Sequence, residues 1–231
     1  MIVLITGASA GFGEAMARKF VANGHRVIAA ARRTERLARL HGELGERLLP
    51  VTMDVTDRAS VEGALAQLPA DWKPIDVLVN NAGIQRRHPF TEFPEQEWND
   101  VIAVNQTAVF LVSQAVTRHM VERKAGKVIN ICSMQSELGR DTITPYAASK
   151  GAVKMLTRGM CVELAEYNIQ VNGIAPGYFA TEMTAALVND RDFSAWLYQR
   201  TPAARWGKPE ELIGAAVYLA SPAANFVNGH L

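Results

Sequence analysis

The stretch "IVLITGASAGFGEAMARKF" (2–20) joins a short apolar run to a glycine-rich turn and then to a segment with helical periodicity. Its spaced glycines form a G-x-x-x-G-x-G pattern in the turn. Glycines permit a tight turn and a close approach of the backbone to a ligand, and a helix that starts there presents free N–H groups and the positive end of its dipole. Because the turn lies between a strand and a helix, the pattern predicts a dinucleotide site rather than a merely structural turn. The residues expected there are Gly7, Ser9, Gly11, Phe12 and Gly13.

The rest of the chain repeats this alternation of short apolar runs and longer segments with helical periodicity. The further runs are "RVIAA" (26–30), "LLPVTM" (48–53), "IDVLVN" (75–80), "KVINIC" (127–132) and "IQVNGIA" (169–175). They are apolar almost throughout, as in parallel strands that helices cover on both faces. The alternation therefore predicts an α/β fold with a doubly wound parallel sheet of the Rossmann type. Because the 231 residues contain no low-complexity linker, we expect a single domain over residues 1–231.

The composition argues against several classes of function. A net charge of +1 is unlike a surface for nucleic acid or membrane, since either normally brings a basic excess. Cys132 and Cys161 are too few for a disulfide framework or a cysteine zinc site, and the five histidines show no metal-ligand spacing. No apolar run reaches the length of a bilayer span. We therefore expect a cytoplasmic protein without a metal site that acts on a small molecule.

The residues after the second apolar run discriminate between two dinucleotides. NAD sites of this type place an acidic residue about twenty positions after the glycines, where it binds the ribose hydroxyls. This chain has Ala31 there, followed by Arg32 and Arg33. Guanidinium groups hold a 2′-phosphate with charge-assisted hydrogen bonds, so the pattern favours NADP, with NAD as a weaker alternative. The competing interpretation is that both arginines simply begin a solvated helix.

Small and polar residues follow the next two apolar runs. Asp54 and Val55 come after the third run, where an adenine edge would rest, although Asp54 is equally compatible with a helix cap. "NNAG" (80–83) follows the fourth run, and its small residues suit contact with a flat ligand. The residues assigned to the cofactor in this motif are Asn81, Ala82 and Gly83.

Three residues with proton-transfer chemistry lie after the fifth run. Ser133 stands at the carboxyl end of that strand, and Tyr146 and Lys150 are four residues apart on one face of the following helix. An isolated Tyr has a pKa of about 10 and is a poor base at neutral pH, but a nearby ammonium favours the phenolate. The alternative is an amphipathic helix with a half-buried Tyr and a solvated Lys.

Motifs along the whole chain resemble those of the short-chain dehydrogenases/reductases. They are "TGASAGFG" (6–13), "NNAG" (80–83), Asn105 in "VIAVNQT", Ser133, "YAASK" (146–150) and "PGYFATEM" (176–183), in the order and at the spacing of that family. The resemblance implies an oxidoreductase in which Tyr146 exchanges a proton with the substrate while a hydride moves to or from the cofactor. It also implies that Lys150 holds the nicotinamide ribose, that Ser133 orients the substrate oxygen and that Asn105 anchors a water relay to Lys150.

The same resemblance assigns roles after the last apolar run. Pro176, Gly177 and Thr181 correspond to family contacts with the carboxamide and phosphates of the cofactor, and the residues from Thr181 to about 201 would form a lid. Family members are usually homotetramers, which predicts a homo-oligomer, a tetramer or a dimer, built on the helices 95–123 and 145–167. Members also continue past "VNGH" into a further strand, so we expect the last strand to be missing and a sheet edge to be exposed.

Two parts of the chain resemble two different groups within the family, and the boundary between the parts lies near "VNNAG". From about Ile84 onward, "GIQRRHPFTEFPEQEWND" and "ICSMQSELGRDTITPYAASK" resemble bacterial gluconate 5-dehydrogenases, also called 5-keto-gluconate reductases. In the first third, "MIVLITGASAGFGEAMARKF" and "AARRTERL" resemble NADP-dependent 3-hydroxy acid (serine) dehydrogenases. The substrate loops belong to the longer part, so the favoured substrates are gluconate and 5-keto-gluconate. The alternatives are a serine-type 3-hydroxy acid dehydrogenase and an NADP-binding sensor or scaffold that catalyses weakly.

A sugar acid requires a cation for its carboxylate and hydrogen-bonding groups for its hydroxyls. "QRRH" (85–88) and "QSELGR" (135–140) follow the fourth and fifth runs, so both can face the reacting carbon. Arg86 or Arg87 is the candidate for the carboxylate. The candidates for the hydroxyls are Gln135, Glu137 and Arg140, together with Ser133 and Tyr146 at the reacting oxygen. The competing interpretation of each loop residue is an exposed side chain without a ligand.

Overall fold

β1 (Ile2–Thr6) lies near the centre of a six-stranded sheet in the computed structural model, which describes all residues from 1 to 231. The strand order is β3-β2-β1-β4-β5-β6. The other strands are β2 (Arg26–Ala31), β3 (Leu48–Thr52), β4 (Val77–Asn80), β5 (Gly126–Ile131) and β6 (Ile169–Ile174). Every predicted run forms a strand and every neighbouring pair is parallel, so the predicted doubly wound α/β sheet is confirmed.

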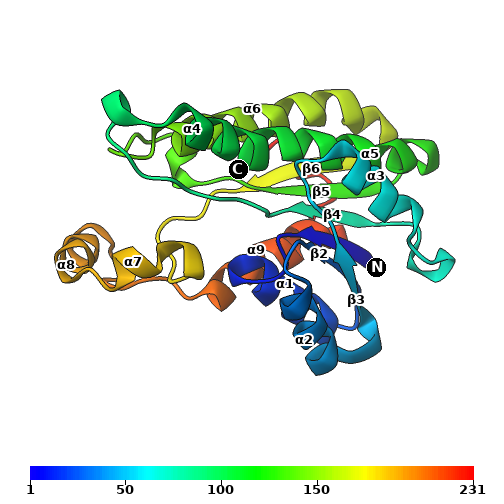
Figure 1. Ribbon diagram of the computed structural model, residues 1–231. Helices are drawn as coiled ribbons and strands as arrows, with labels where there is room; N and C mark the ends of the chain where they lie inside the picture. Colours follow the sequence, from blue (N-terminus) through cyan, green and yellow to red (C-terminus); the bar gives the residue numbers. More distant parts are fainter.

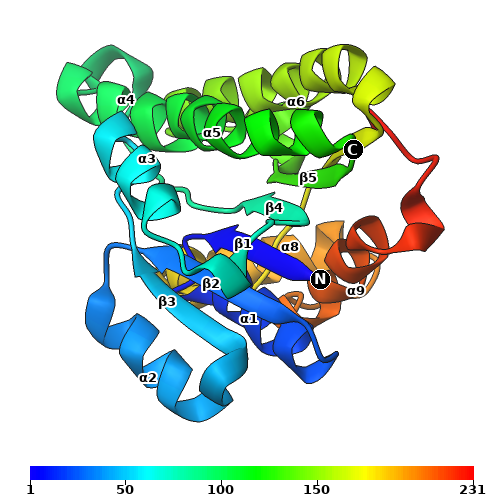
Figure 2. The same cartoon turned by 90° about the vertical axis from the view of Figure 1, so that its right-hand side faces the viewer.

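Helices cover both faces of the sheet (Figure 1). The helices on one face are α1 (Gly11–Ala22), α2 (Thr34–Leu44) and α9 (Pro209–Ala220). Those on the other face are α3 (Arg58–Ala66), α4 (Glu95–Ile102), α5 (Ala108–Arg123) and α6 (Thr144–Leu164). Figure 2 shows the same two layers from the side, with the sheet between them.

Alternate residues of β1 face different helical layers. Val3 and Ile5 belong to the core that contains Phe20 of α1, whereas Leu4 belongs to the core that contains Val116 of α5. All three strand residues are fully buried. A strand covered on both faces has no solvent side, which is why this run is apolar at every position instead of at every second one.

The sheet has its topological switch point between β1 and β4. Ile5 lies opposite Ala29 of β2 on one side and opposite Val79 of β4 on the other. The segments that follow β1 and β4 therefore leave the sheet in different directions and open a crevice at their carboxyl ends.

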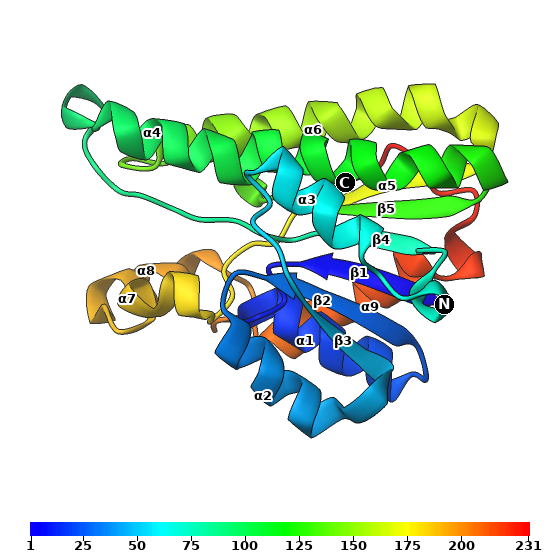
Figure 3. The same cartoon turned by 45° about the vertical axis from the view of Figure 1, so that its right-hand side comes forward.

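Two short helices extend beyond this edge of the sheet. They are α7 (Ala185–Val188) and α8 (Arg191–Arg200), and Figure 3 shows them projecting past the carboxyl ends of the strands. The predicted helix 95–123 is interrupted between α4 and α5 by a π-helical turn at Ala103–Thr107. The short 3₁₀ segments are Gly45–Arg47, Ala70–Trp72, Phe90–Glu92, Met134–Ser136, Ala165–Tyr167, Glu182–Thr184 and Pro222–Ala224. None of the helices combines the length and the apolar character that crossing a bilayer requires.

The outer edge of β6 is partly covered by the last residues of the chain. The N–H of Gly229 donates to the carbonyl of Val171 at 2.9 Å, and the N–H of Gly173 donates to the carbonyl of His230 at 2.7 Å. β6 is the outermost strand on this side of the sheet. The edge that was expected to be exposed is partly covered, because the segment 227–231 satisfies part of the β6 backbone.

Candidate active site

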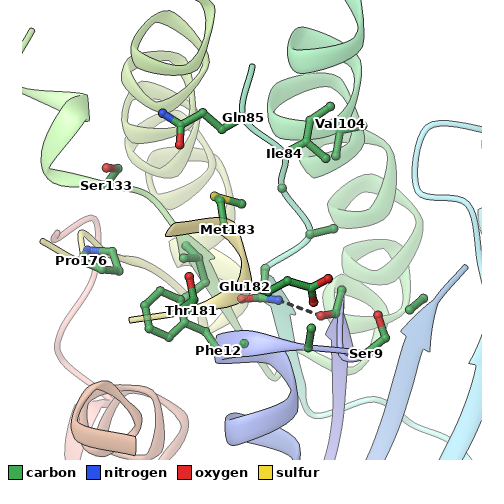
Figure 4. Close-up of a pocket in the computed structure, with 18 of the residues that line it drawn as sticks. Ser9, Phe12, Ile84, Gln85, Val104, Ser133, Pro176, Thr181, Glu182 and Met183 are labelled. Carbon is green, nitrogen blue, oxygen red and sulfur yellow. Dashed lines mark hydrogen bonds between the residues drawn. The ribbon is translucent and has the colours of Figure 1, made fainter. Parts of the chain in front are cut away.

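A pocket of about 590 Å³ lies at the carboxyl ends of the strands, where the segments that follow all six strands meet (Figure 4). Small-molecule and cofactor sites have volumes of roughly 300–1,000 Å³, and open parallel sheets bind ligands at this edge. The predicted residues that line the pocket are Gly7, Ser9, Gly11, Phe12, Arg32, Arg33, Asp54, Val55, Asn81, Ala82, Gly83, Arg86, Ser133, Tyr146, Lys150, Pro176, Gly177 and Thr181.

Some predicted site residues do not line this pocket, namely Gly13, Arg87, Asn105, Gln135 and Arg140. Gly13 lies where α1 packs against the turn after β1. A Cβ at Gly13 would overlap the carbonyl oxygen of Gly7 and lie 2.6 Å from Asn81 Nδ2. Any side chain at this position would therefore push the start of α1 away from the turn after β1.

The glycine-rich turn requires its glycines for both conformation and space. Gly7 and Gly11 have φ angles of 65° and 55°, and a Cβ on Gly7 would lie 2.8 Å from Ala82 Cα. Asn81 Nδ2 donates to the carbonyl of Thr6 at 2.9 Å, and the N–H groups of Asn81 and Ala82 donate to Thr6 Oγ1 at 3.0 and 3.1 Å. The turns after β1 and β4 thus form one rigid floor.

One end of the pocket is charged and exposed, and we call Arg32, Arg33, Arg36 and Glu182 the charged end. Arg33 Nε donates to Ser9 Oγ at 3.0 Å. Glu182, from the segment after β6, accepts from Arg33 Nη1 at 3.1 Å and from Arg36 Nη1 at 2.6 Å. Between 42% and 66% of each of the four side chains is exposed. The charged end therefore presents guanidinium groups to solvent and to the pocket.

Asp54 lies beside the charged end. Its Oδ1 accepts from the N–H and the hydroxyl of Thr56 at 3.0 and 2.7 Å, and Arg32 Nη1 lies 3.7 Å from Oδ2. The hydrogen bond from Thr56, aided by the charge of Arg32, holds the pKa of Asp54 below its usual value. The interpretation of Asp54 as a helix cap is wrong, because the cap of α3 is Asp57, which accepts from the N–H of Ala59 at 2.9 Å.

The other end of the pocket is enclosed, and we call Asn105, Ser133, Tyr146 and Lys150 the buried end. Asn105 lies in the π-helical turn with no exposed surface. Its Nδ2 donates to the carbonyl of Ile84 at 2.9 Å and to Ser149 Oγ at 3.2 Å, and its Oδ1 accepts from the N–H of Ile84 at 2.8 Å. Asn105 therefore ties the segment after β4 to α6, immediately behind the pocket wall.

Lys150 is buried, with only 5% of its surface exposed. Its Nζ donates to the carbonyl of Ile131 at 2.6 Å and lies 5.7 Å from the centre of the Tyr146 ring. Burial lowers the pKa of Lys150 to about 8. The interpretation of Lys150 as a solvated residue of a surface helix is therefore wrong.

Tyr146 and Ser133 form the proton-carrying part of the buried end. Burial raises the pKa of the Tyr146 phenol, and a hydrogen bond with the Ser133 hydroxyl opposes this rise. Burial is the largest influence, so the net shift of the Tyr146 pKa is upward and not the downward shift that a nearby ammonium alone would give. The N–H of Gln135 donates to Ser133 Oγ at 3.1 Å, so the Ser133 hydroxyl keeps its own hydrogen for another acceptor. Tyr146 is thus protonated at neutral pH and can donate.

The two arginines after β4 have different surroundings. Arg86 lines the pocket, and its Nε lies 3.7 Å from Glu97 Oε2. The Arg87 guanidinium has neither an ion pair nor a hydrogen bond, and burial and the nearby charge of Arg140 lower its pKa. The Arg140 guanidinium carbon lies 4.5 Å from the centre of the Phe193 ring on α8. Of the two arginines after β4, Arg87 is thus the one without a hydrogen-bond or ion-pair partner.

The remaining substrate candidates differ in whether they already have partners. Gln135 Oε1 is buried without a hydrogen-bond partner, which is rare for a buried polar atom. Glu137 forms an ion pair with Lys154 of α6, and His88 Nε2 lies 3.0 Å from Glu97 Oε2. Gln135 thus remains a candidate for a substrate hydroxyl, whereas Glu137 and His88 are engaged elsewhere.

The structure adds pocket residues that the sequence did not assign to the site, namely Ala10, Ala31, Met53, Ile84, Gln85, Val104, Ile131, Cys132, Phe179, Glu182, Met183 and Thr184. Most of them are next to predicted residues in the sequence, so their position in or beside the motifs could have identified them. Glu182 directly follows Thr181, but its pairing with Arg33 joins positions 149 residues apart, which no local pattern reveals. Nowhere do three or more His, Cys, Asp or Glu side chains come together in a way that could hold a metal ion.

Known proteins share both the sequence and the fold of this chain. A sequence model of the family described as short chain dehydrogenase matches residues 1–192. The 5-keto-D-gluconate 5-reductase of Escherichia coli K12 is 69% identical over 99% of this chain and 91% of its own length. This similarity is not confined to the residues after Ile84.

Solved structures of similar proteins share the fold of this chain over almost its whole length. A gluconate 5-dehydrogenase from Burkholderia cenocepacia, crystallised with NADP and tartrate, is 50% identical with a TM-score of 0.94, over 99% of this chain and 91% of its own. A serine dehydrogenase in its closed form with NADP⁺ is 36% identical with a TM-score of 0.90, over 100% of this chain and 93% of its own. With the family match extending over most of the chain, the protein belongs to the short chain dehydrogenase family.

Proposed function

We propose that this chain is an NADP-dependent oxidoreductase that interconverts gluconate and 5-keto-gluconate, acting as one domain over residues 1–231. The observation that carries the proposal is the buried end, where a protonated Tyr146 and the Lys150 ammonium adjoin a pocket built on a glycine-rich turn. The similar reductase of Escherichia coli and the dehydrogenase of Burkholderia cenocepacia support the substrate class.

The residues of the pocket fit a dinucleotide phosphate. Gly7 and Gly11 keep the floor free of side chains, and a Cβ added at Gly83 would meet Asn105 Oδ1 at 3.4 Å. Arg32 and Arg33 would hold the 2′-phosphate, with Ser9 beside them, and Asp54 and Val55 would border the adenine. When bound, the cofactor would supply or accept the hydride.

The buried end would handle the proton. In the reducing direction Tyr146 would donate its phenolic proton to the substrate oxygen, and Ser133 would turn its hydroxyl hydrogen from Tyr146 to the same oxygen. Lys150 would place a positive charge at the pocket floor, where it binds ribose hydroxyls and favours the phenolate once Tyr146 has lost its proton. Asn105 would hold the segment after β4 against α6, and so fix the water relay to Lys150.

The substrate would extend from Tyr146 towards Arg87. Arg87 lacks an anionic partner of its own, so we assign it, with Arg140 beside it, to the carboxylate of the sugar acid. Gln135 Oε1 lacks a donor and would accept from a hydroxyl. The tartrate that was crystallised with the Burkholderia cenocepacia enzyme is also a hydroxy acid, which supports a site for hydroxyl and carboxylate groups together.

Two other functions compete with this proposal. The serine dehydrogenase similarity favours a 3-hydroxy acid dehydrogenase, but the identity is lower than with the keto-gluconate reductase. An NADP-binding sensor or scaffold would have no need of a Tyr, a Ser and a buried Lys at one point. We further propose a cytoplasmic homo-oligomer, a dimer or a tetramer, that buries exposed apolar residues of α5 and α6 such as Phe110, Met155 and Val162.

The proposal is tested by following NADPH oxidation and NADP reduction with the purified chain across a substrate panel. The panel holds gluconate, 5-keto-gluconate and L-serine, each with NADP(H) and with NAD(H). The expected result is the highest kcat/KM with 5-keto-gluconate and NADPH. A higher kcat/KM with L-serine would favour the 3-hydroxy acid dehydrogenase, and cofactor binding without turnover on any substrate would favour the sensor.

A further inference from the structure

At the charged end, the Glu182 carboxylate connects the segment after β6 with the segment after β2. Glu182 Oε1 and Oε2 lie 3.1 and 3.2 Å from Arg33 Nη1, and Oε2 lies 2.6 Å from Arg36 Nη1. Arg36 belongs to α2, whereas Glu182 belongs to the segment after β6. Figure 4 shows Thr181, Glu182 and Met183 along this segment, above the turn that carries Ser9 and Phe12. The ion pairs hold the pKa of Glu182 below its usual value, with Arg36 as the main cause.

The position of Glu182 is fixed by its own turn. Thr184 Oγ1 donates to the carbonyl of Phe179 at 2.7 Å and accepts from the N–H of Thr181 at 2.9 Å. The Phe179 ring packs edge-on against Phe12 of α1 with ring centres 5.3 Å apart. The turn is therefore anchored to the glycine-rich segment, so the reach of Glu182 towards α2 follows from the backbone and not from a free loop.

Arg33 cannot bind both the Glu182 carboxylate and a bidentate phosphate in this geometry. Its Nε donates to Ser9 and its Nη1 donates to Glu182, which leaves Nη2 as the guanidinium nitrogen without a partner. A phosphate placed there would also lie close to the Glu182 carboxylate, and like charges repel. A 2′-phosphate that is held by both terminal nitrogens of Arg33 therefore displaces Glu182 from Nη1, whereas a dinucleotide with a free 2′-hydroxyl does not.

We propose that Glu182 is an internal competitor of the cofactor 2′-phosphate and thereby sets how strongly the chain discriminates NADP from NAD. This inference rests on the proposed function, because it requires the adenosine end of a dinucleotide at Arg33. Displacement leaves Glu182 with Arg36, the nearer of its two partners, so the segment after β6 stays anchored while Arg33 turns to the phosphate. Glu182 thus weakens NADP binding and leaves NAD binding almost unchanged.

The test measures Kd by calorimetry for two probes that isolate the adenosine end, adenosine 2′,5′-bisphosphate and 5′-AMP. The proteins are the wild type, Glu182→Gln and the matched control Glu43→Gln. Glu43 is a partly exposed carboxylate of α2 that pairs with Arg18 and Arg39 and does not line the pocket, so its variant makes the same charge change. A thermal melt of each protein checks that the variants are folded.

Glu182→Gln is expected to bind the bisphosphate about three- to ten-fold more tightly than the wild type, the range of one or two exposed charge pairs. Its affinity for 5′-AMP should change less than two-fold, and Glu43→Gln should match the wild type with both probes. The inference about Glu182 would be overturned if Glu182→Gln and Glu43→Gln bound the bisphosphate with equal affinity. If the wild type still preferred the bisphosphate to 5′-AMP, the NADP assignment would stand. If no protein of the set prefers the bisphosphate, the NADP assignment fails as well.

Discussion

At the buried end of the pocket, Asn105 and Lys150 expose 0% and 5% of their surface and their polar atoms have fixed protein partners. At the charged end, Arg33 and Glu182 expose 45% and 55% of their side chains and hold each other in ion pairs that solvent can screen. Electrostatic interactions are several-fold stronger in an enclosed site than at a hydrated surface. The difference indicates that proton transfer depends on groups held rigidly in place, whereas cofactor choice depends on charges that can exchange partners.

Among the variants that compare the two ends, the largest effect should follow from Lys150→Met at the buried end. Loss of the ammonium removes the charge that favours the phenolate, so turnover should fall by about 10²–10⁴-fold, the range of general acid–base contributions. Lys154→Met is the control, because Lys154 lies one turn further along α6, pairs with Glu137 and does not line the pocket. Steady-state kinetics on both variants measure the effect, and an equal loss in Lys154→Met would remove the special role of Lys150.

The same pair of variants has a readout that does not depend on catalysis. The pKa of Lys150 is lowered from 10.5 to about 8 in the folded protein, so between these pH values the unfolded chain binds more protons than the folded one. The wild type should therefore gain stability, on the order of 3 kcal/mol, as the pH rises through this window. Thermal or urea unfolding at several pH values should show this gain in Lys154→Met and not in Lys150→Met.

Arg33→Ala should produce a smaller effect that is confined to the cofactor. A charge-assisted hydrogen bond contributes about 1.5–3 kcal/mol, so the Kd for NADP should rise by about 10- to 100-fold. The Kd for NAD should change less than two-fold, and kcat at saturating NADPH should stay close to the wild-type value. Arg39→Ala is the control, since Arg39 lies on α2, which directly follows Arg33 in the chain, and faces Glu14 and Glu43. Equal losses of NADP and NAD affinity would show that Arg33 acts on folding and not on the phosphate.

Arg87→Ala should have the smallest effect of the three. Arg87 is the unpaired guanidinium and Arg86 already faces Glu97, so the KM for 5-keto-gluconate should rise about ten-fold in Arg87→Ala and about two-fold in Arg86→Ala. The cofactor Kd should be unchanged in both variants. Initial-rate measurements over a range of substrate concentrations would reveal the opposite ranking if Arg86 binds the carboxylate.

The two ends also differ in how far the sequence predicts them. The strands and the residues directly after them follow from local patterns, because a parallel sheet always brings the carboxyl ends of its strands to one edge. Ser133, Tyr146 and Lys150 lie together for this reason. The direction of the Tyr146 pKa shift did not follow from local patterns, since the raised pKa depends on how deeply the folded protein buries the phenol.

At the charged end the sequence identified Arg32 and Arg33 but not Glu182. The pairing of Arg33 with Glu182 depends on where the turn after β6 meets the start of α2, and neither segment carries a signal for the other. Asp54 illustrates the same limit, because its type suggested a cap, whereas the neighbouring Asp57 caps α3. Contacts between distant segments are thus the part of the site that required the structure.

The assignment of Tyr146 as the proton donor to 5-keto-gluconate underlies the proposed reaction. Its sharpest test compares wild type and Tyr146→Phe for NADPH binding by calorimetry and for NADPH oxidation with 5-keto-gluconate. The phenyl ring keeps the packing and removes only the hydroxyl, so we expect an NADPH Kd within about two-fold of wild type and a kcat lower by about 10²–10⁴-fold. A kcat close to the wild-type value in a variant that binds NADPH normally would contradict the role of Tyr146 in proton transfer.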